Sequence, residues 1–187
     1  PVETTDIGRQ IVDQAKVLLN EAGRIDEIVQ INKGEVKGDF RLAFIPTIGP
    51  SVIPRFLMDF AKKYPQLNLH ITEMQTDIIL DQLKKGLIDA AVLATPLDAE
   101  GVIEKPLYYE PFMAFVPEIH RLYKEKFVSV KELDINDMLL LREGHCFRNS
   151  VLNLCGKNTV KKDKLANVHL ESGNFETLIK LAKQGFG

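Results

Sequence analysis

The sequence predicts an α/β protein in which a long helix leads into a mostly parallel sheet. Apolar residues recur every three or four positions between residues 6 and 32, which is a helical period. After residue 38, short runs rich in apolar residues alternate with helical patterns, as in parallel sheets. The 187 residues are 45% hydrophobic and 27% charged, a globular composition that suits one core or two small lobes.

Residues 6–32 are expected to form one helix with a narrow apolar seam, and Asp6 is its expected N-cap. The steps along the seam alternate between four and three residues, the heptad pattern of helices that pair with one another. A surface helix packed on its own domain is the alternative, and we favour a dimerising helix. The seam consists of Ile11, Ala15, Leu18, Ala22, Ile25 and Val29.

A polar segment with two glycines, residues 32–38, reads as a hinge between this helix and the sheet. Strands and helices then alternate, which indicates parallel pairing. The expected strands are Asp39–Ile45, Leu67–Met74 and Ala90–Ala94, and the expected helices are Val52–Lys63 and Ile78–Lys85.

Beyond Pro96 the pattern is less regular. The expected strands are Val102–Leu107, Phe112–Val116, Asp137–Leu141 and Ala166–Leu170, and the expected helices are Phe147–Leu154 and Phe175–Lys183. A helix closed by glycine normally leads into another strand, but the sequence ends at Gly187. We therefore expect the closing elements of the fold to be missing from this chain.

Several classes of protein fit the composition poorly. No apolar run approaches the length of a membrane span, and the N-terminus lacks the basic and apolar regions of a signal peptide, so a cytoplasmic location without a membrane partner is expected. The formal charge of −2 argues against a large nucleic-acid-binding surface on these residues. Any DNA-binding part is expected to lie mostly elsewhere.

Cys146 and Cys155 are the only cysteines. In a reducing compartment a disulfide between them would be transient, as in redox sensors and catalysts. Cysteine also packs as a small buried apolar residue, which would suit Cys155 between leucines. Cys146 has a more polar setting, beside His145 and two residues before Arg148, that favours the thiolate. The residues alone leave the reactive and the structural interpretations open.

The nine-residue spacing of the cysteines has a mechanical consequence. If residues 147–154 are helical, the two Cα atoms lie roughly 13 Å apart, whereas a disulfide needs them within ~7 Å. Joining them requires the helix to unwind. A covalent event would then be coupled to a backbone rearrangement, as a sensor requires.

Polar residues follow three of the expected strands. Thr47 follows the first strand, Thr76 the second, and Cys146 the strand Asp137–Leu141. The carboxyl ends of parallel strands face a common crevice where ligands bind. Helix capping alone would explain the presence of either threonine. Two threonine hydroxyls that face a possible thiolate instead indicate a site for a small polar ligand.

Other chemistries lack their usual residues. Two cysteines nine apart with one nearby histidine do not match a zinc site, and neither Cys-x-x-Cys nor a phosphate-binding glycine loop occurs. A Cys–His hydrolase has no recognisable third partner. No metal and no cofactor are expected.

Three motifs together resemble one family: Gly144-His145-Cys146-Phe147-Arg148 with a second cysteine nine residues on, the Pro-Thr-Ile-Gly-Pro run at 46–50, and Glu-Met-Gln-Thr at 73–76. The chain resembles the OxyR group of LysR-type transcriptional regulators, which sense peroxide. The resemblance implies a two-lobed regulatory domain similar to periplasmic binding proteins. Its parts would be a winged-helix tail (1–8), a linker helix (9–33), lobe I (34–108) and lobe II (109–187) with a redox segment (143–156).

The resemblance also implies roles for single residues. Cys146 would be the peroxidatic cysteine and Cys155 the resolving one. Asn149 stands where the family commonly has aspartate, so a carboxylate that assists proton movement would be absent. The positions used to bind peroxide or to activate the sulfur correspond to Thr47, Thr76, His145 and Arg148.

By the same resemblance, the partners would be hydrogen peroxide, promoter DNA through the mostly absent N-terminal domain, further copies of the chain in a dimer or tetramer, and RNA polymerase. The protein would be a regulator and not an enzyme. Two alternatives stay open: a LysR-type regulator that binds a small organic effector, and a thiol peroxidase.

Overall fold

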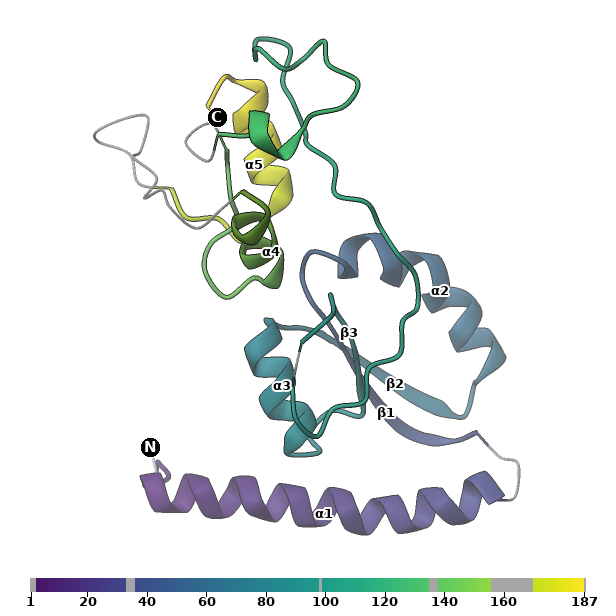
Figure 1. The fold of residues 1–187 in the computed structure, drawn as a ribbon. Helices are drawn as coiled ribbons and strands as arrows, with labels where there is room; N and C mark the ends of the chain where they lie inside the picture. Colours follow the sequence, from purple (N-terminus) through teal and green to yellow (C-terminus); the bar gives the residue numbers. More distant parts are fainter. Residues whose placement is uncertain (1–2, 33–35, 98, 135–137, 156–169, 187) are drawn as a thin grey trace. The chain divides into compact units, whose positions relative to one another are not determined.

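The computed structural model describes residues 3–32, 36–97, 99–134, 138–155 and 170–186 (Figure 1). The chain divides into two compact units, residues 1–104 and 105–187. No helix in the described parts of the chain is long and apolar enough to cross a membrane.

The first unit begins with α1, Asp6–Asn32, which confirms the predicted long helix. The predicted cap is wrong by one residue, because Asp6 lies in the first turn and Thr5 precedes it. The backbone N–H of Gly8 donates to Thr5 Oγ1 at 3.0 Å, so the shorter threonine side chain caps the helix.

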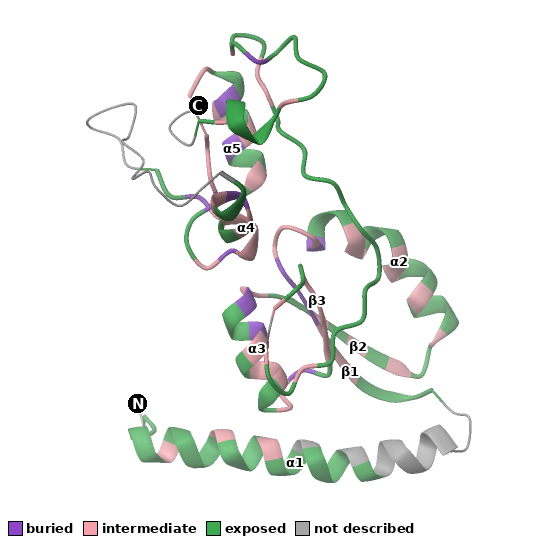
Figure 2. Ribbon diagram, in the orientation of Figure 1, coloured by how far each residue is buried: buried purple, intermediate pink, exposed green. Residues whose placement is uncertain are grey.

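The apolar seam of α1 is not covered by the rest of its unit. Ile11, Leu18 and Ile25 keep 64%, 65% and 66% of their surface exposed, and the described part of α1 is largely green in Figure 2. This is the arrangement expected of a helix that pairs with a partner.

A three-stranded parallel sheet in the order β2-β1-β3 forms the centre of the first unit, which confirms the predicted sheet. Its strands are β1 (Gly38–Phe44), β2 (Leu67–Glu73) and β3 (Ala90–Val92). The connecting helices are α2 (Gly49–Lys63) and α3 (Thr76–Lys84).

The end of β1 forms the centre of the core. Ala43, Phe44 and Ile45 are buried, together with Ile79 of α3 and Ile88 before β3. The ring of Phe44 stacks on Phe56 of α2, with ring centroids 6.1 Å apart. The packing therefore fixes the carboxyl end of β1, which leads directly into the turn that holds Thr47.

The regular elements in the described part of the second unit are helices, joined by irregular segments. It contains a short 3₁₀ helix, η1 (Val130–Glu132), and two α-helices, α4 (Cys146–Cys155) and α5 (Phe175–Lys183), which confirms both predicted helices. Its buried apolar side chains are Leu122, Leu141, Val151, Leu178 and Ala182.

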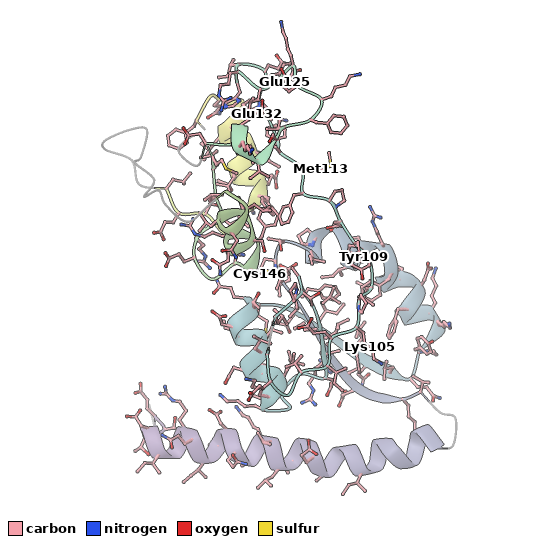
Figure 3. The ribbon with its side chains drawn as sticks, viewed as in Figure 1. Lys105, Tyr109, Met113, Glu125, Glu132 and Cys146 are labelled. Atoms are coloured by element: carbon pink, nitrogen blue, oxygen red, sulfur yellow. The ribbon has the colours of Figure 1, made fainter. Side chains whose placement is uncertain are left out.

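The strands predicted at Val102–Leu107 and Phe112–Val116 do not form. These residues are extended but pair with none of the described strands, and side chains such as Met113 (83% exposed) and Tyr109 (90% exposed) project from the segment (Figure 3). An apolar run becomes a strand only when a neighbour takes up its backbone hydrogen bonds. Residues 138–141 likewise form no strand, and most of Ala166–Leu170 lies outside the described residues.

Candidate functional site

The two predicted threonines lie at the same edge of the sheet. Thr47 sits in the turn after β1, and Thr76 is the first residue of α3, directly after β2. Since β1 and β2 are adjacent and pair in parallel up to Phe44 and Glu73, both threonines follow carboxyl ends of neighbouring strands. The topology thus supports the predicted placement of these two residues.

The hydroxyl of Thr76 is buried at the start of α3. The residue is 8% exposed, and its Oγ1 forms no hydrogen bond among the described residues. Gln75, which precedes α3, makes no side-chain cap hydrogen bond. The Thr76 hydroxyl makes no cap hydrogen bond to the described residues either. A buried hydroxyl without a partner costs roughly 1–3 kcal/mol, so the Thr76 hydroxyl is a candidate to bind a small polar molecule.

In the second unit, a tight turn carries His145 into the interior. Gly144 has φ of 87°, a conformation that glycine adopts far more easily than other residues. The His145 side chain that follows is only 5% exposed, and its Nε2 has no hydrogen-bond partner in the described parts of the chain. Burial, and secondarily the Arg142 guanidinium, lower the pKa of His145. This disfavours a positive charge on His145 as the means of activating the sulfur.

The cysteines are the first and last residues of α4. Cys146 is half-buried with a free thiol, and Figure 3 shows it at the start of the helix. With α4 intact, the Cα atoms of Cys146 and Cys155 lie roughly 13 Å apart, about twice the reach of a disulfide. The predicted need for unwinding therefore follows from the observed helix.

Arg148 holds the start of α4 in place. Its backbone N–H donates to the His145 carbonyl at 3.0 Å, and its Nη1 donates to the Leu141 carbonyl at 3.0 Å. These bonds fix the guanidinium beside the segment that carries Cys146. Asn149 is exposed on the same helix.

Aromatic packing fixes the first turn of α4. The ring of Phe147 lies between Phe112, at a centroid distance of 5.4 Å, and Phe175 at 5.0 Å. Phe175 is the first residue of α5, so the two helices meet where the redox segment begins.

Sequence reasoning missed the loop that faces His145, residues 172–174. The Arg142 N–H donates to the Ser172 carbonyl at 2.8 Å. A Cβ on Gly173 would lie 3.0 Å from His145 Nε2 and 3.3 Å from Arg142 Nε. The Ser-Gly-Asn run before a helix signals only a cap, and the contact with His145 depends on tertiary packing.

No cluster of three or more histidine, cysteine or acidic side chains that could hold a metal ion occurs among the described residues. Thr47 and Thr76 belong to the first unit, whereas His145, Cys146 and Arg148 belong to the second. Their union in one pocket stays a prediction.

Comparison with known proteins shows which family the chain belongs to. Residues 33–187 match the family described as the LysR substrate binding domain. The chain belongs to this family. Among solved structures, the reduced form of the OxyR regulatory domain from Pseudomonas aeruginosa is 32% identical, with a TM-score of 0.67, over 81% of this chain and 70% of that one. These values make the chain a member of the OxyR group.

Two further relatives extend the match to α1. The hydrogen peroxide-inducible genes activator of Haemophilus influenzae is 31% identical over 98% of this chain and 60% of its own length. A peroxide-bound OxyR mutant of Corynebacterium glutamicum is 28% identical with a TM-score of 0.73, over 98% of this chain and 57% of that one. This chain thus spans about 60% of the length of the curated relatives it matches.

Proposed function

We propose that this chain is the regulatory part of a hydrogen-peroxide-sensing transcriptional regulator. The observation that carries the proposal is the position of the cysteines at the two ends of one short helix, in a member of the OxyR group. The relatives named as peroxide-inducible activators support the same assignment.

The chemistry proceeds in two steps. The Cys146 thiolate attacks one oxygen of hydrogen peroxide and breaks the O–O bond, giving a sulfenic acid and hydroxide, which takes up a proton to become water. The Cys155 thiolate then attacks the sulfenic sulfur, forms the disulfide and expels a second hydroxide. The two thiols are oxidised and the peroxide is reduced to two waters.

Neighbouring residues have distinct parts in this scheme. The hydroxyls of Thr47 and Thr76 hold the peroxide, and the unpartnered Oγ1 of Thr76 supports such a role. His145 offers an uncharged hydrogen-bonding group, and Arg148 supplies positive charge from a fixed position. Asn149 stands where the family commonly has a carboxylate that assists proton movement, so the proposal covers the switch and not its rate.

Disulfide formation changes the backbone conformation, and this change is the signal that reaches the rest of the protein. Because the two sulfurs cannot meet across an intact helix, α4 unwinds when they join. The lobes, residues 34–108 and 109–187, then change how they pair with a second copy in a dimer or tetramer. The exposed seam of α1 passes this change to a DNA-binding domain at promoter DNA, where RNA polymerase is the downstream partner.

Thiol alkylation followed by mass spectrometry, before and after brief exposure to low peroxide, tests the chemistry. The parent chain should gain an intramolecular Cys146–Cys155 crosslink, and Cys155→Ser should stop at a sulfenic acid on Cys146. Cys146→Ser should form no crosslink and give no transcriptional response. A crosslink in Cys155→Ser, or a response in Cys146→Ser, contradicts the scheme.

Peroxide consumption separates the sensor from a thiol peroxidase. With a thiol reductant present, a sensor consumes peroxide in near-stoichiometric amounts during the oxidation phase, whereas a peroxidase turns over many times. Sustained turnover would assign the same cysteines to an enzyme.

A regulator that responds to a small organic effector is the second candidate, and the buried free hydroxyl of Thr76 favours it too. In that case, metabolites would raise the melting temperature of the Cys146→Ser, Cys155→Ser double variant. Absence of any such shift, combined with the crosslink above, supports the peroxide sensor.

A further inference from the structure

We propose that Gly173 is a positioning residue that holds the His145 ring in its buried place and thereby insulates Cys146 from a change of charge on this neighbour. The inference rests on the proposed peroxide function only for its biological meaning. The structural part concerns the contact between the loop at residues 172–174 and the His145 ring.

A side chain at position 173 would crowd the His145 ring. An added Cβ would lie 3.0 Å from His145 Nε2 and 3.6 Å from its Cε1, and the first of these distances is shorter than an ordinary van der Waals contact. The Nε2–Cε1 edge of the imidazole therefore packs directly against the glycine backbone. Nε2 is buried there and has no hydrogen-bond partner among the described residues.

The loop itself is held firmly. The Ser172 carbonyl accepts from the Arg142 N–H at 2.8 Å, and Ser172 Oγ accepts from the Asn174 N–H at 3.1 Å. Asn174 Oδ1 in turn accepts from the Glu176 N–H at 2.7 Å and so ties the loop to α5. Any group added at Gly173 would consequently displace the ring rather than the loop.

Burial and the charge of Arg142 both disfavour the protonated form of His145. The charged groups of the two segments that pack here are Arg142, Glu143 and Arg148 on one side and Glu171 and Glu176 on the other. Burial is the larger cause of the lowered pKa of His145, and the Arg142 guanidinium is the second. Protonation would place a second positive charge beside Arg142 with no acceptor at Nε2.

An uncharged neighbour has a consequence for a sensor. A histidine with its ordinary pKa near 6.5 changes charge within the physiological range, and the field at an adjacent thiol changes with it. The lowered pKa keeps His145 uncharged over more of this range, so the oxidation rate of Cys146 varies with pH through its own thiol and less through its neighbour.

The test is the titration of His145 by NMR, with its ring signal assigned by its loss in His145→Asn. In the reduced parent chain the midpoint should lie below 6.5, the ordinary value. In Gly173→Ala the ring has to shift by a few tenths of an ångström, which loosens its burial, and the midpoint should rise toward 6.5. Gly23→Ala, where an added Cβ meets nothing within 4 Å, is the matched control and should leave the midpoint unchanged.

The functional readout is the rate of Cys146 oxidation by peroxide between pH 6 and 8. The parent and Gly23→Ala should follow the ionisation of a single thiol, whereas Gly173→Ala should show a second, severalfold step where His145 titrates. A parent midpoint at 6.5, or a Gly173→Ala midpoint equal to that of the parent, overturns the positioning role. If the His145 midpoint changes in Gly173→Ala but the pH profile of Cys146 oxidation shows no second step, the charge of His145 does not affect Cys146 and the proposed insulation is wrong.

The double variant Gly173→Ala, His145→Ala covers the case in which Gly173→Ala alone does not fold. Removing the ring opens the space that the new methyl group needs, so the double variant should recover the folded state. If the double variant does not fold either, Gly173 is needed for the conformation of its loop and not for the position of the His145 ring. All of these results are independent of whether Cys146 and Cys155 form a disulfide.

Discussion

The sheet-connecting helices of the first unit, α2 and α3, and the helices η1 and α5 of the second unit begin in different ways. In the first unit, α2 and α3 begin without a side-chain cap and are joined at both ends to strands of a hydrogen-bonded sheet. In the second, η1 and α5 begin with side-chain caps from Ser129 and Asn174. No strand lies among the described residues of that unit. The first unit is a frame held by backbone bonds, whereas the second relies on individual side chains.

The helix that carries both cysteines, α4, lies in the unit where a helix can unwind without disturbing any sheet that the described residues form. Unwinding α4 breaks its own backbone hydrogen bonds and the ring contacts of Phe147. Unwinding a helix such as α3, which lies between two strands, would disturb a parallel ladder as well. A redox switch therefore costs less free energy in the second unit than it would in the first.

The largest expected effect is on the frame. Phe44→Ala removes a side chain that is 1% exposed at the centre of the sheet and should lower the free energy of unfolding by about 3–5 kcal/mol. Urea denaturation measures it. Met58→Ala on α2 is the control, because Met58 is 65% exposed and its loss should change stability by less than about 0.5 kcal/mol. Equal effects of the two variants would refute the assignment of the core.

A smaller loss with a larger functional consequence is expected from Phe147→Ala. The half-buried ring loses its contacts with Phe112 and Phe175, which should lower the free energy of unfolding by about 2 kcal/mol. Because those contacts also hold α4 helical, the Cys146–Cys155 crosslink should form faster after peroxide is added. Quenched-flow alkylation measures the rate.

Tyr109→Ala is the matched control for that rate, since it also removes an aromatic ring from the second unit, but one that is 90% exposed. It should change neither stability nor the rate of crosslinking. If Phe147→Ala slowed the crosslink, or left it unchanged while lowering stability, packing of the first turn would not be what resists unwinding.

The same contrast explains which elements the sequence predicts. Strands and helices of the first unit follow local periodicity: the expected strand Asp39–Ile45 differs by one residue at each end from β1, Gly38–Phe44. Residues 112–116 have an equally strandlike pattern, yet no strand forms there. Pairing depends on a neighbour distant in sequence, which a local pattern does not reveal.

The candidate site shows the same limit. The Gly-His-Cys motif, the cysteine spacing and the polar residues after β1 and β2 are all visible in the sequence, and α4 has nearly its predicted bounds. The contact of Gly173 with His145 is not visible, because 28 positions separate the two residues. A glycine before a helix cap looks like an ordinary loop residue until the fold places a ring against it.

The smallest effect concerns the helix caps. Asn174 Oδ1 accepts from the Glu176 N–H at 2.7 Å, so Asn174→Ala leaves that donor without its partner and should lower the free energy of unfolding by about 1 kcal/mol. Gln75→Ala, at the equivalent position before α3, removes no cap hydrogen bond and should cost clearly less. Urea denaturation of both variants measures the difference.

This pair of variants tests the comparison of the two units most directly, since both change one polar residue before a helix of nine residues. In α5, the loss should appear as fraying of the first turn, with faster amide exchange from Glu176 onward. A backbone bond to the residue before the helix remains in both variants, from the Ile79 N–H to the Gln75 carbonyl in α3 and from the Leu178 N–H to the Asn174 carbonyl in α5, so the side-chain cap is the difference that is tested. Equal losses from both variants would mean that the frame, too, depends on its caps, and that the position of the cysteines in the second unit needs another physical reason.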